Sequence, residues 1–199
     1  MKPLLIGISG GSGAGKSTLI RGLQTSVAVN TSILAMDDYY KDQSDIPIEQ
    51  RTEMNYDSLE AVDISLFVSH LDALKSSTDI AAPVYDFQKH TRSSATQTVA
   101  AEPLIFLDGI MLLAVEEIRS RLDLSVFIEV DTDTRLSRRF ERDQKTRGRS
   151  RESVESQWRE TVQPFFESTI SKARHHADLI LQNQDFSRLL KVLELFRAT

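Results

Sequence analysis

Two glycines, a lysine and a serine near the N-terminus have the types and the spacing of a phosphate-binding loop. Four residues separate Gly10 from Gly15, and Lys16 and Ser17 follow at once, which fits the pattern G-x-x-x-x-G-K followed by S or T. Glycines let the backbone wrap closely around an anion, and the helix that follows adds its positive end. We expect Lys16 to reach the β- and γ-phosphates of a nucleoside triphosphate and Ser17 to bind Mg²⁺. The predicted nucleotide-binding residues are Gly10, Gly11, Ser12, Gly13, Ala14, Gly15, Lys16, Ser17 and Thr18.

Carboxylates follow two other apolar segments of the chain. Asp108 lies near the end of "PLIFLDG" (103–109), a position from which an acid can steer Mg²⁺ directly or through water. Asp37 and Asp38 follow "SILAM", and one such acid is suited to accept the proton of an acceptor hydroxyl in a kinase reaction. A surface carboxylate at 108 and an Asp-rich turn or helix cap at 37–38 are the alternatives. The spacing alone does not choose between them.

Four arginines are spaced so that they share one face of a helix. Arg138, Arg139 and Arg142 follow Arg135 by three, four and seven residues, and their like charges repel unless an anion collects them. Arginine forks suit phosphoryl oxygens. An RNA-binding arm is one alternative, which the formal net charge of −5 disfavours. A solvated helix is the other, with acidic partners Asp131, Asp133, Glu141 and Asp143.

Apolar runs of strand length alternate with helical patterns along the chain. We expect helices over 16–29 and 59–74 and a hairpin excursion at about 80–100, formed by "DIAAPVYDF" and "TQTVAAE". Near-continuous apolar strands alternating with helices predict an α/β fold, a three-layer sandwich around a parallel five-stranded sheet. The chain is expected to form one domain over 1–199, with an arginine-rich helical lid at about 133–160. The expected core strands are 3–9, 32–36, 103–109, 124–130 and 177–183.

The composition is that of an ordinary soluble globular protein. Of the 199 residues, 40% are hydrophobic and 27% charged, and none is cysteine, so disulfides and thiolate metal sites are excluded. No apolar run approaches the ~20 residues of a membrane span, and no signal peptide is evident. We therefore expect a cytoplasmic protein that binds neither a membrane nor, given its negative charge, nucleic acid.

Eight segments together resemble the uridine–cytidine kinases, within the phosphoribulokinase/uridine kinase group of P-loop kinases. They are "GGSGAGKST", "MDDYYKD", "NYD", "PVYDFQKHTR", "LDGI", "DTDTRLSRRFERD", "RGR" and "QWRETVQPFF", in the order of that family. The resemblance extends to about Leu181 and implies a kinase that uses ATP or GTP with Mg²⁺. Its expected reaction is phosphorylation of the 5′-hydroxyl of uridine and cytidine, which are small-molecule nucleosides.

The resemblance also implies roles for residues of the acceptor site. Asp37 resembles the general base beside the sugar 5′-hydroxyl, and Asp57 the carboxylate that binds the ribose 2′- and 3′-hydroxyls. Tyr40 lines the nucleoside site, while Tyr85 and His90 are similar to the residues that contact the pyrimidine. A histidine at this position favours both uridine and cytidine.

A basic segment carries the remaining residues that the resemblance implies. Arg139 matches an arginine that contacts the sugar or phosphates, and Gln157 lies in the nucleoside pocket. The cations expected to close over the triphosphate are Arg142, Arg147 and Arg149, with Arg149 also counted in the nucleoside site. Relatives commonly form tetramers, so a homo-oligomer, tetramer or dimer, is an expectation.

The acceptor and the activity each have an alternative. Asp108 stands where the family usually has Glu, and "NYDSLEAVD" departs from the usual "NFDHPDAFD" in the loop that follows Asp57. The same chemistry on another nucleoside, pantothenate or a sugar phosphate is one alternative. A nucleotide-binding regulator without kinase activity is the other.

Overall fold

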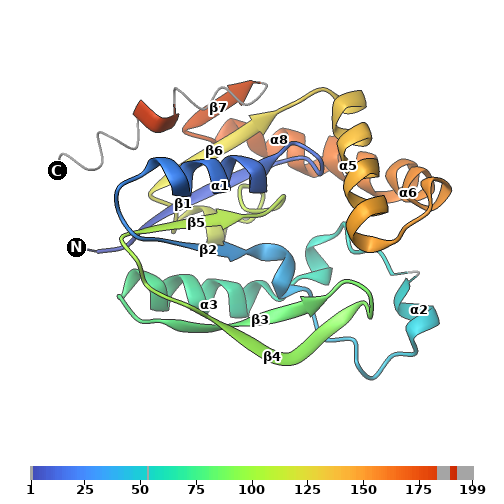
Figure 1. Cartoon of the computed structure of the whole chain (residues 1–199), viewed down its shortest axis with the longest axis horizontal. Helices are drawn as coiled ribbons and strands as arrows, with labels where there is room; N and C mark the ends of the chain where they lie inside the picture. Colours follow the sequence, from blue (N-terminus) through green and yellow to red (C-terminus); the bar gives the residue numbers. More distant parts are fainter. Residues whose placement is uncertain (1, 53, 183–188, 192–199) are drawn as a thin grey trace.

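Five parallel strands form the centre of the molecule (Figure 1). The computed structural model describes residues 2–52, 54–182 and 189–191. The strand order is β2-β5-β1-β6-β7, and each neighbouring pair is parallel. The predicted parallel five-stranded sheet is therefore confirmed. The strands are β1 (Leu4–Gly10), β2 (Thr31–Ala35), β5 (Leu104–Asp108), β6 (Leu124–Glu129) and β7 (Leu179–Gln182).

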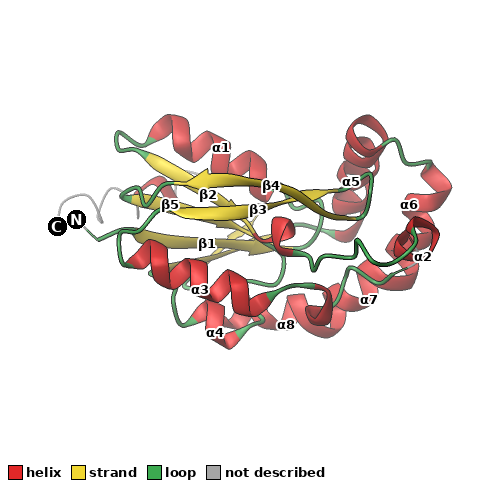
Figure 2. Ribbon diagram, turned by 90° about the horizontal axis from the view of Figure 1, so that it is seen from below, coloured by secondary structure: helices red, strands yellow, loops and turns green. Residues whose placement is uncertain are grey.

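Helices cover both faces of this sheet, which explains why its strands are apolar on both sides. Successive residues point to opposite faces, so Leu5 belongs to one buried cluster and Ile6 to the other. The first cluster contains residues of α3 (Ile64–Lys75) and the second contains residues of α1 (Lys16–Ser26). Figure 2 shows α1 on one side of the sheet, and on the other α3, α4 (Glu116–Arg119) and α8 (Ser171–Ala173). The predicted three-layer arrangement is confirmed.

The helices mostly follow the predicted segments, with two corrections. The first helix ends at Ser26, short of residue 29. The helix predicted over 59–74 begins only at Ile64, because the Asp63 side chain caps it by accepting the Leu66 N–H at 3.1 Å. Residues Leu59–Ala61 form a separate 3₁₀ turn, η2. The helical segments before the hairpin are α1 (Lys16–Ser26), η1 (Met36–Tyr39), α2 (Ile48–Thr52), η2 and α3 (Ile64–Lys75).

An antiparallel hairpin, β3 (Ile80–Asp86) and β4 (Thr91–Val99), forms a second sheet of its own. The predicted excursion is confirmed, but its second strand begins at Thr91 and not at residue 96. His90 occupies the turn between the strands with a positive φ of 52°. The hairpin contacts η1, so it lies beside the segment that carries Asp37.

The C-terminal half contains a short helix and one long helix, and it continues as a nearly unbroken helical run. α5 is capped by Asp131, which accepts the Thr134 N–H at 2.8 Å, and it ends at Gly148 with a φ of 63°. Two π-helical segments, η3 and η4, interrupt the run that follows. The segments are α4 (Glu116–Arg119), α5 (Thr132–Arg147), α6 (Arg151–Gln157), η3 (Trp158–Val162), α7 (Gln163–Phe165), η4 (Phe166–Ile170), α8 (Ser171–Ala173) and η5 (Arg174–His176).

Two further predictions concern where the last strand ends and whether any helix could cross a membrane. The last predicted strand ends at Gln182, and Asn183, which was expected to extend it, lies outside the described residues. Across 2–52, 54–182 and 189–191, no helix combines the length and the apolar character that crossing a bilayer requires.

Candidate active site

The loop between β1 and α1 has the backbone geometry that its glycines predict. Gly10, Gly13 and Gly15 have φ values of 144°, 81° and 91°, in a region that side chains rarely adopt. A Cβ at Gly13 would lie 2.1 Å from the backbone oxygen of Arg135, so α5 leaves no room for one. Gly10 and Gly13 therefore require glycine for both conformation and space, and Gly15 requires it for conformation. The loop and its two flanking elements are those of a phosphate-binding site.

Lys16 begins α1 and folds its side chain back along this loop. Its Nζ donates to the backbone oxygens of Gly10 at 3.1 Å and Gly11 at 3.4 Å. Burial lowers the pKa of Lys16, an effect that the nearby carboxylates of Asp108 and Asp37 oppose. The ammonium therefore lies between the loop and the two acids of the strand ends.

Ser17 and Asp108, the two residues predicted to bind Mg²⁺, lie in direct contact. The Ser17 Oγ donates to Asp108 Oδ2 at 2.5 Å, which brings a hydroxyl and a carboxylate oxygen to one point. Mg²⁺ prefers hard oxygen ligands of this kind and keeps several waters or substrate oxygens beside them. The described residues contain no cluster of three or more His, Cys, Asp or Glu side chains that could hold an ion alone. This pair fits a metal that shares its coordination with a bound phosphate.

The structure separates the two adjacent acids of η1. Asp38 accepts the Tyr85 N–H at 3.3 Å and the Gln97 Nε2 at 3.2 Å, so it ties η1 to the hairpin. Asp37 instead lines a cavity beside the loop. Burial and then Asp108 raise the pKa of Asp37, while Lys16 and two arginines of α5 lower it. Of these two adjacent acids, only Asp37 lines the cavity.

One cavity of about 810 Å³ extends from the loop to the hairpin. Ser12 and Asp37 lie at its loop side, and Asp57 and His90 line it as well. A space of this volume is typical of a small-molecule site. The structure therefore brings residues from distant parts of the chain to one chamber. The other predicted residues that line it are Tyr40, Tyr85, Arg139, Arg142, Arg147, Arg149 and Gln157.

Aromatic rings form one wall of this cavity. The ring centroid of Tyr40 lies 5.2 Å from that of Tyr85 and 5.4 Å from that of Tyr56, and Tyr56 lies 5.6 Å from the His90 ring. The Tyr85 hydroxyl is buried and has no hydrogen-bond partner among the described residues. Burial and then Arg149 lower the pKa of His90, so its ring is neutral at neutral pH. The wall offers flat apolar surface with neutral polar tips.

Two lining aromatics were missed by the sequence analysis. Tyr56 and Phe87 both face the cavity, and Arg147 lies 4.4 Å above the Phe87 ring. Each is adjacent to, or two residues from, a predicted site residue in the segments "NYD" and "PVYDFQKHTR". Both are aromatic residues within segments already expected to form the site, and this pattern could have identified them.

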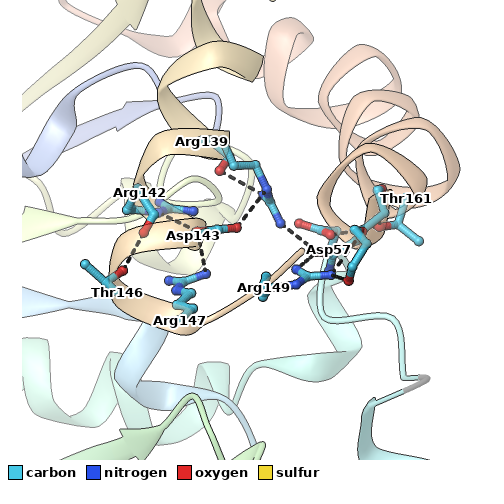
Figure 3. A network of polar contacts seen from close by, with 11 residues as sticks. Asp57, Arg139, Arg142, Asp143, Thr146, Arg147, Arg149 and Thr161 are labelled. Atoms are coloured by element: carbon cyan, nitrogen blue, oxygen red, sulfur yellow. Dashed lines mark hydrogen bonds and ion pairs between the residues drawn. The ribbon is translucent and has the colours of Figure 1, made fainter. Parts of the chain in front are cut away.

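Asp57 is held by a residue 104 positions away. Its side chain is buried, and Oδ2 accepts the Thr161 hydroxyl at 2.9 Å (Figure 3). The same hydroxyl lies 3.1 Å from the backbone oxygen of Gln157. Thr161 comes from η3 and was not predicted. The contact fixes one carboxylate oxygen of Asp57 and leaves the other for a ligand.

A buried carboxylate organises the arginines of α5. Asp143 has no exposed surface and lies within ion-pair distance of Arg139, Arg142 and Arg147 (Figure 3). Because these charges converge around a buried acid, the alternative of a solvated helix is wrong here, although Asp143, one of its four acidic partners, does pair with the arginines. Arg139 also donates to Ser12 Oγ at 2.9 Å and to Gln157 Oε1 at 2.7 Å. Its guanidinium therefore connects Ser12 of the glycine loop to Gln157 in the cavity wall.

The expected four-arginine face is split between three environments. Arg139 and Arg142 line the cavity, while Arg138 is exposed. Arg135 is buried below the loop, where its guanidinium carbon lies 3.8 Å from the Phe166 ring centroid and its NH2 donates to Gln163 at 3.0 Å. The prediction that all four arginines crowd one face is therefore wrong for Arg138, and packing against η4 and α7 removes Arg135 from the cavity.

A parallel sheet whose central strand leads through a glycine loop into a helix, with an acid at the end of the adjacent strand, defines a P-loop nucleotide-binding fold. Residues 5–188 match the model of the Phosphoribulokinase / Uridine kinase family, and the chain belongs to this family. The resemblance drawn from the sequence motifs is therefore confirmed at the level of the family.

Curated relatives are similar over most of their length. The chain is 44% identical over 182 residues to a uridine kinase from Deinococcus deserti, covering 91% of this chain and 88% of the relative. It is 40% identical over 189 residues to a uridine kinase from Halobacterium salinarum, covering 95% and 84%. The solved structure of phosphoribulokinase from Rhodobacter spheroides superposes with a TM-score of 0.67 at 15% identity, covering 91% of this chain and 70% of that one. This last likeness concerns the fold.

Proposed function

We propose that the protein is a uridine kinase, which transfers the γ-phosphoryl group of ATP or GTP to the 5′-hydroxyl of uridine and cytidine. The observation that carries the proposal is the single cavity that joins Ser12 and Asp37, beside the glycine loop, to Asp57 and the aromatic wall. Relatives named uridine kinase, 40–44% identical over at least 91% of this chain, support it.

The donor triphosphate lies along the glycine loop. Backbone N–H groups and the N-terminus of α1 bind its phosphates, and Lys16 neutralises part of their charge. Ser17 and Asp108 would hold Mg²⁺, which would supply positive charge to offset that of the phosphates. Arg142 and Arg147 line the cavity and supply the forked donors that suit phosphoryl oxygens.

The nucleoside lies between the aromatic wall and the carboxylate of Asp57. Asp57, oriented by Thr161, accepts hydrogen bonds from the 2′- and 3′-hydroxyls of the ribose. Tyr40 and Tyr85 pack against the base, and the neutral His90 ring can hydrogen-bond its edge. The acceptor hydroxyl is then directed at the loop side of the cavity, where Asp37 lies.

Asp37 accepts the proton of the 5′-hydroxyl as the phosphoryl group moves in line. The raised pKa of this buried carboxyl gives it more proton affinity than an ordinary aspartate, which suits a base. We further propose that α5 and α6 close over the two substrates as a lid. Closure excludes water, which would otherwise compete with the nucleoside for the phosphoryl group.

The test is ADP release from ATP–Mg²⁺ with a panel of acceptors: uridine, cytidine, adenosine, nicotinamide riboside, pantothenate and ribulose 5-phosphate. We expect turnover with uridine and cytidine that falls by roughly 10³-fold or more in Asp37→Asn. Asp45→Asn is the control, because Asp45 is exposed and lies eight residues further along. Turnover with a different acceptor alone would mean that the kinase acts on that compound and not on uridine or cytidine. ATP binding without any turnover would favour the nucleotide-binding regulator.

A further inference from the structure

The carboxylate of Asp143 lies inside the cluster of arginines that face the cavity, although Asp143 itself does not line it. Its Oδ1 accepts the Arg142 Nε at 2.8 Å and lies 3.6 Å from Arg147 NH1, and its Oδ2 lies 3.4 Å from Arg139 Nε. Figure 3 shows the three guanidinium groups converging on this one side chain. Any effect of Asp143 on a molecule in the cavity is therefore transmitted through the arginines.

The charges of this cluster do not balance. Three cations surround one anion, and all three of Arg139, Arg142 and Arg147 reach the cavity wall. Like charges this close repel each other, and the carboxylate offsets only part of that repulsion. Despite its burial, the arginines lower the pKa of Asp143, so it is ionised at neutral pH. The remaining positive charge is directed at the site proposed for the triphosphate.

The backbone of Asp143 anchors the turn that ends the helix. Its carbonyl oxygen accepts the N–H groups of Gly148 and of Arg149, the latter at 3.2 Å. Arg147 lies just before this turn and Arg149 just after it. One residue therefore fixes both the side chains of α5 and the direction of the chain that leaves it.

The cluster is also fixed at its far side. Arg139 donates to Ser12 of the glycine loop at 2.9 Å and to Gln157 at 2.7 Å, and Arg149 donates to the same Gln157 oxygen. A displacement of the Asp143 carboxylate would therefore move guanidinium groups that stand between the donor and acceptor sides. It would not need to disturb the loop itself.

We propose that Asp143 is a positioning residue for phosphoryl transfer. Its carboxylate holds Arg139, Arg142 and Arg147 where they meet the transferring phosphoryl group. This role rests on the proposed kinase function and deepens it. A purely structural ion pair would be expected to affect nucleotide binding and turnover together, whereas a positioning residue affects the transfer step selectively.

The variant Asp143→Asn keeps the shape of the side chain and removes its charge. The three arginines then carry more uncompensated charge, so the attraction for a triphosphate is kept or increased, while their orientation is lost. We expect kcat with uridine to fall about 10²-fold. We expect the dissociation constant for ATP–Mg²⁺, measured by calorimetry without nucleoside, to stay equal to or below that of the wild type. Glu141→Gln is the matched control, an exposed acid on the same helix, and should change neither quantity.

A second variant covers the case in which Asp143→Asn does not fold. Asp143→Glu keeps the charge but moves the carboxylate by one methylene in a site without exposed surface. We expect kcat to fall at least about tenfold with the ATP–Mg²⁺ dissociation constant unchanged. Wild-type kcat in either variant, or nucleotide binding that weakens in proportion to kcat, would overturn the inference. Failure of the proposed function would be distinct, because the wild type itself would then not turn over uridine.

Discussion

The hydroxyl of Ser17 donates to the carboxylate of Asp108 at 2.5 Å, although 91 residues separate them in the chain. Strand pairing brings them together: β1 and β5 are neighbours, and Ile8 is in register with Asp108. The glycine loop leaves β1 two residues after Ile8, so the end of β5 lies beside the start of α1. The sheet therefore builds the two-oxygen pair from residues that local sequence does not connect.

Asp108→Asn should weaken the response of the enzyme to Mg²⁺. An amide oxygen is a weaker ligand than a carboxylate, so we expect the Mg²⁺ concentration for half-maximal rate to rise about 10–100-fold at fixed ATP. A magnesium titration of the initial rate measures this. Asp108→Glu is the control, since it keeps the carboxylate and should respond nearly as the wild type does. If Asp108→Asn responded to magnesium as the wild type does, Asp108 would not be a ligand of Mg²⁺.

The pH profile of kcat/KM for uridine should carry an acid limb from Asp37. Burial and the neighbouring Asp108 raise the pKa of this carboxyl, so its midpoint should lie above the ordinary value of about 3.9. Below that midpoint Asp37 is protonated and cannot act as the base, so the rate falls as the pH falls. The fluorescence of Trp158, the one tryptophan, checks that the protein stays folded. A flat profile down to pH 4 with a folded protein would contradict Asp37 as the base.

Asp37→Asn should make the protein more stable at neutral pH, although it removes activity. The folded pKa of Asp37 is raised, so its stabilising contribution exists below the unfolded pKa and is lost as the pH rises through the folded pKa. Above that range the ionised carboxylate destabilises the fold, and asparagine removes this cost. A gain of about 1 kcal/mol would raise Tm by about 2–4 °C for a chain of this size.

Asp143→Asn should have the opposite sign in the same thermal measurement. The arginines lower the pKa of Asp143, so it stabilises the fold above its unfolded pKa and loses this effect as the pH falls through the folded one. The two variants thus control for each other. If both variants lowered Tm, the ionised side chain of Asp37 would be stabilising the fold, which would contradict the stability cost expected from its raised pKa.

Thr161→Val should weaken the binding of the nucleoside selectively. Valine keeps the shape but loses the hydroxyl that donates to Asp57, so that carboxylate is no longer oriented. A hydrogen bond to a charged group contributes about 1.5–3 kcal/mol, so we expect KM for uridine to rise roughly tenfold or more. The KM for ATP should not change. Thr161→Ser keeps the hydroxyl and should retain most of the affinity; equal losses in both variants would argue against this role.

The sequence predicted those parts of the molecule that depend on local pattern. The glycine loop follows from spacing, because each glycine must adopt its own backbone conformation whatever surrounds it. The core strands follow from apolar runs, because a strand buried on both faces has no polar side. The start of α3 was misplaced, because Leu59 and Val62 fit a helical period while the actual cap, Asp63, lies inside that pattern.

The residues that were missed depend on packing between distant segments. Asp143 was expected only as one of four acidic partners on a solvated helix; because a charged residue within a basic helix is usually exposed, nothing local marked it as buried. Nothing in the sequence around Thr161 marks it as a site residue; its position in η3 brings its hydroxyl to 2.9 Å from Asp57 Oδ2. The roles of Asp37 and Asp38 could not be separated by spacing, since only the hairpin, through Tyr85 and Gln97, identifies which acid is already bonded.

One continuous segment of the chain, between two neighbouring strands of the sheet, carries most of the residues proposed to bind the acceptor. β2 and β5 are neighbours in the sheet, yet everything from Met36 to Pro103 is inserted between them in one uninterrupted stretch. That stretch holds Asp37, Asp57 and the hairpin, whereas the glycine loop and the arginines of α5 lie outside it. Most residues proposed to bind the acceptor therefore lie in one continuous stretch, while those proposed to bind the phosphates lie outside it. Residues that contact this stretch from outside, such as Thr161 against Asp57, Arg147 against Phe87 and Arg121 against Asp72, would have to change with it.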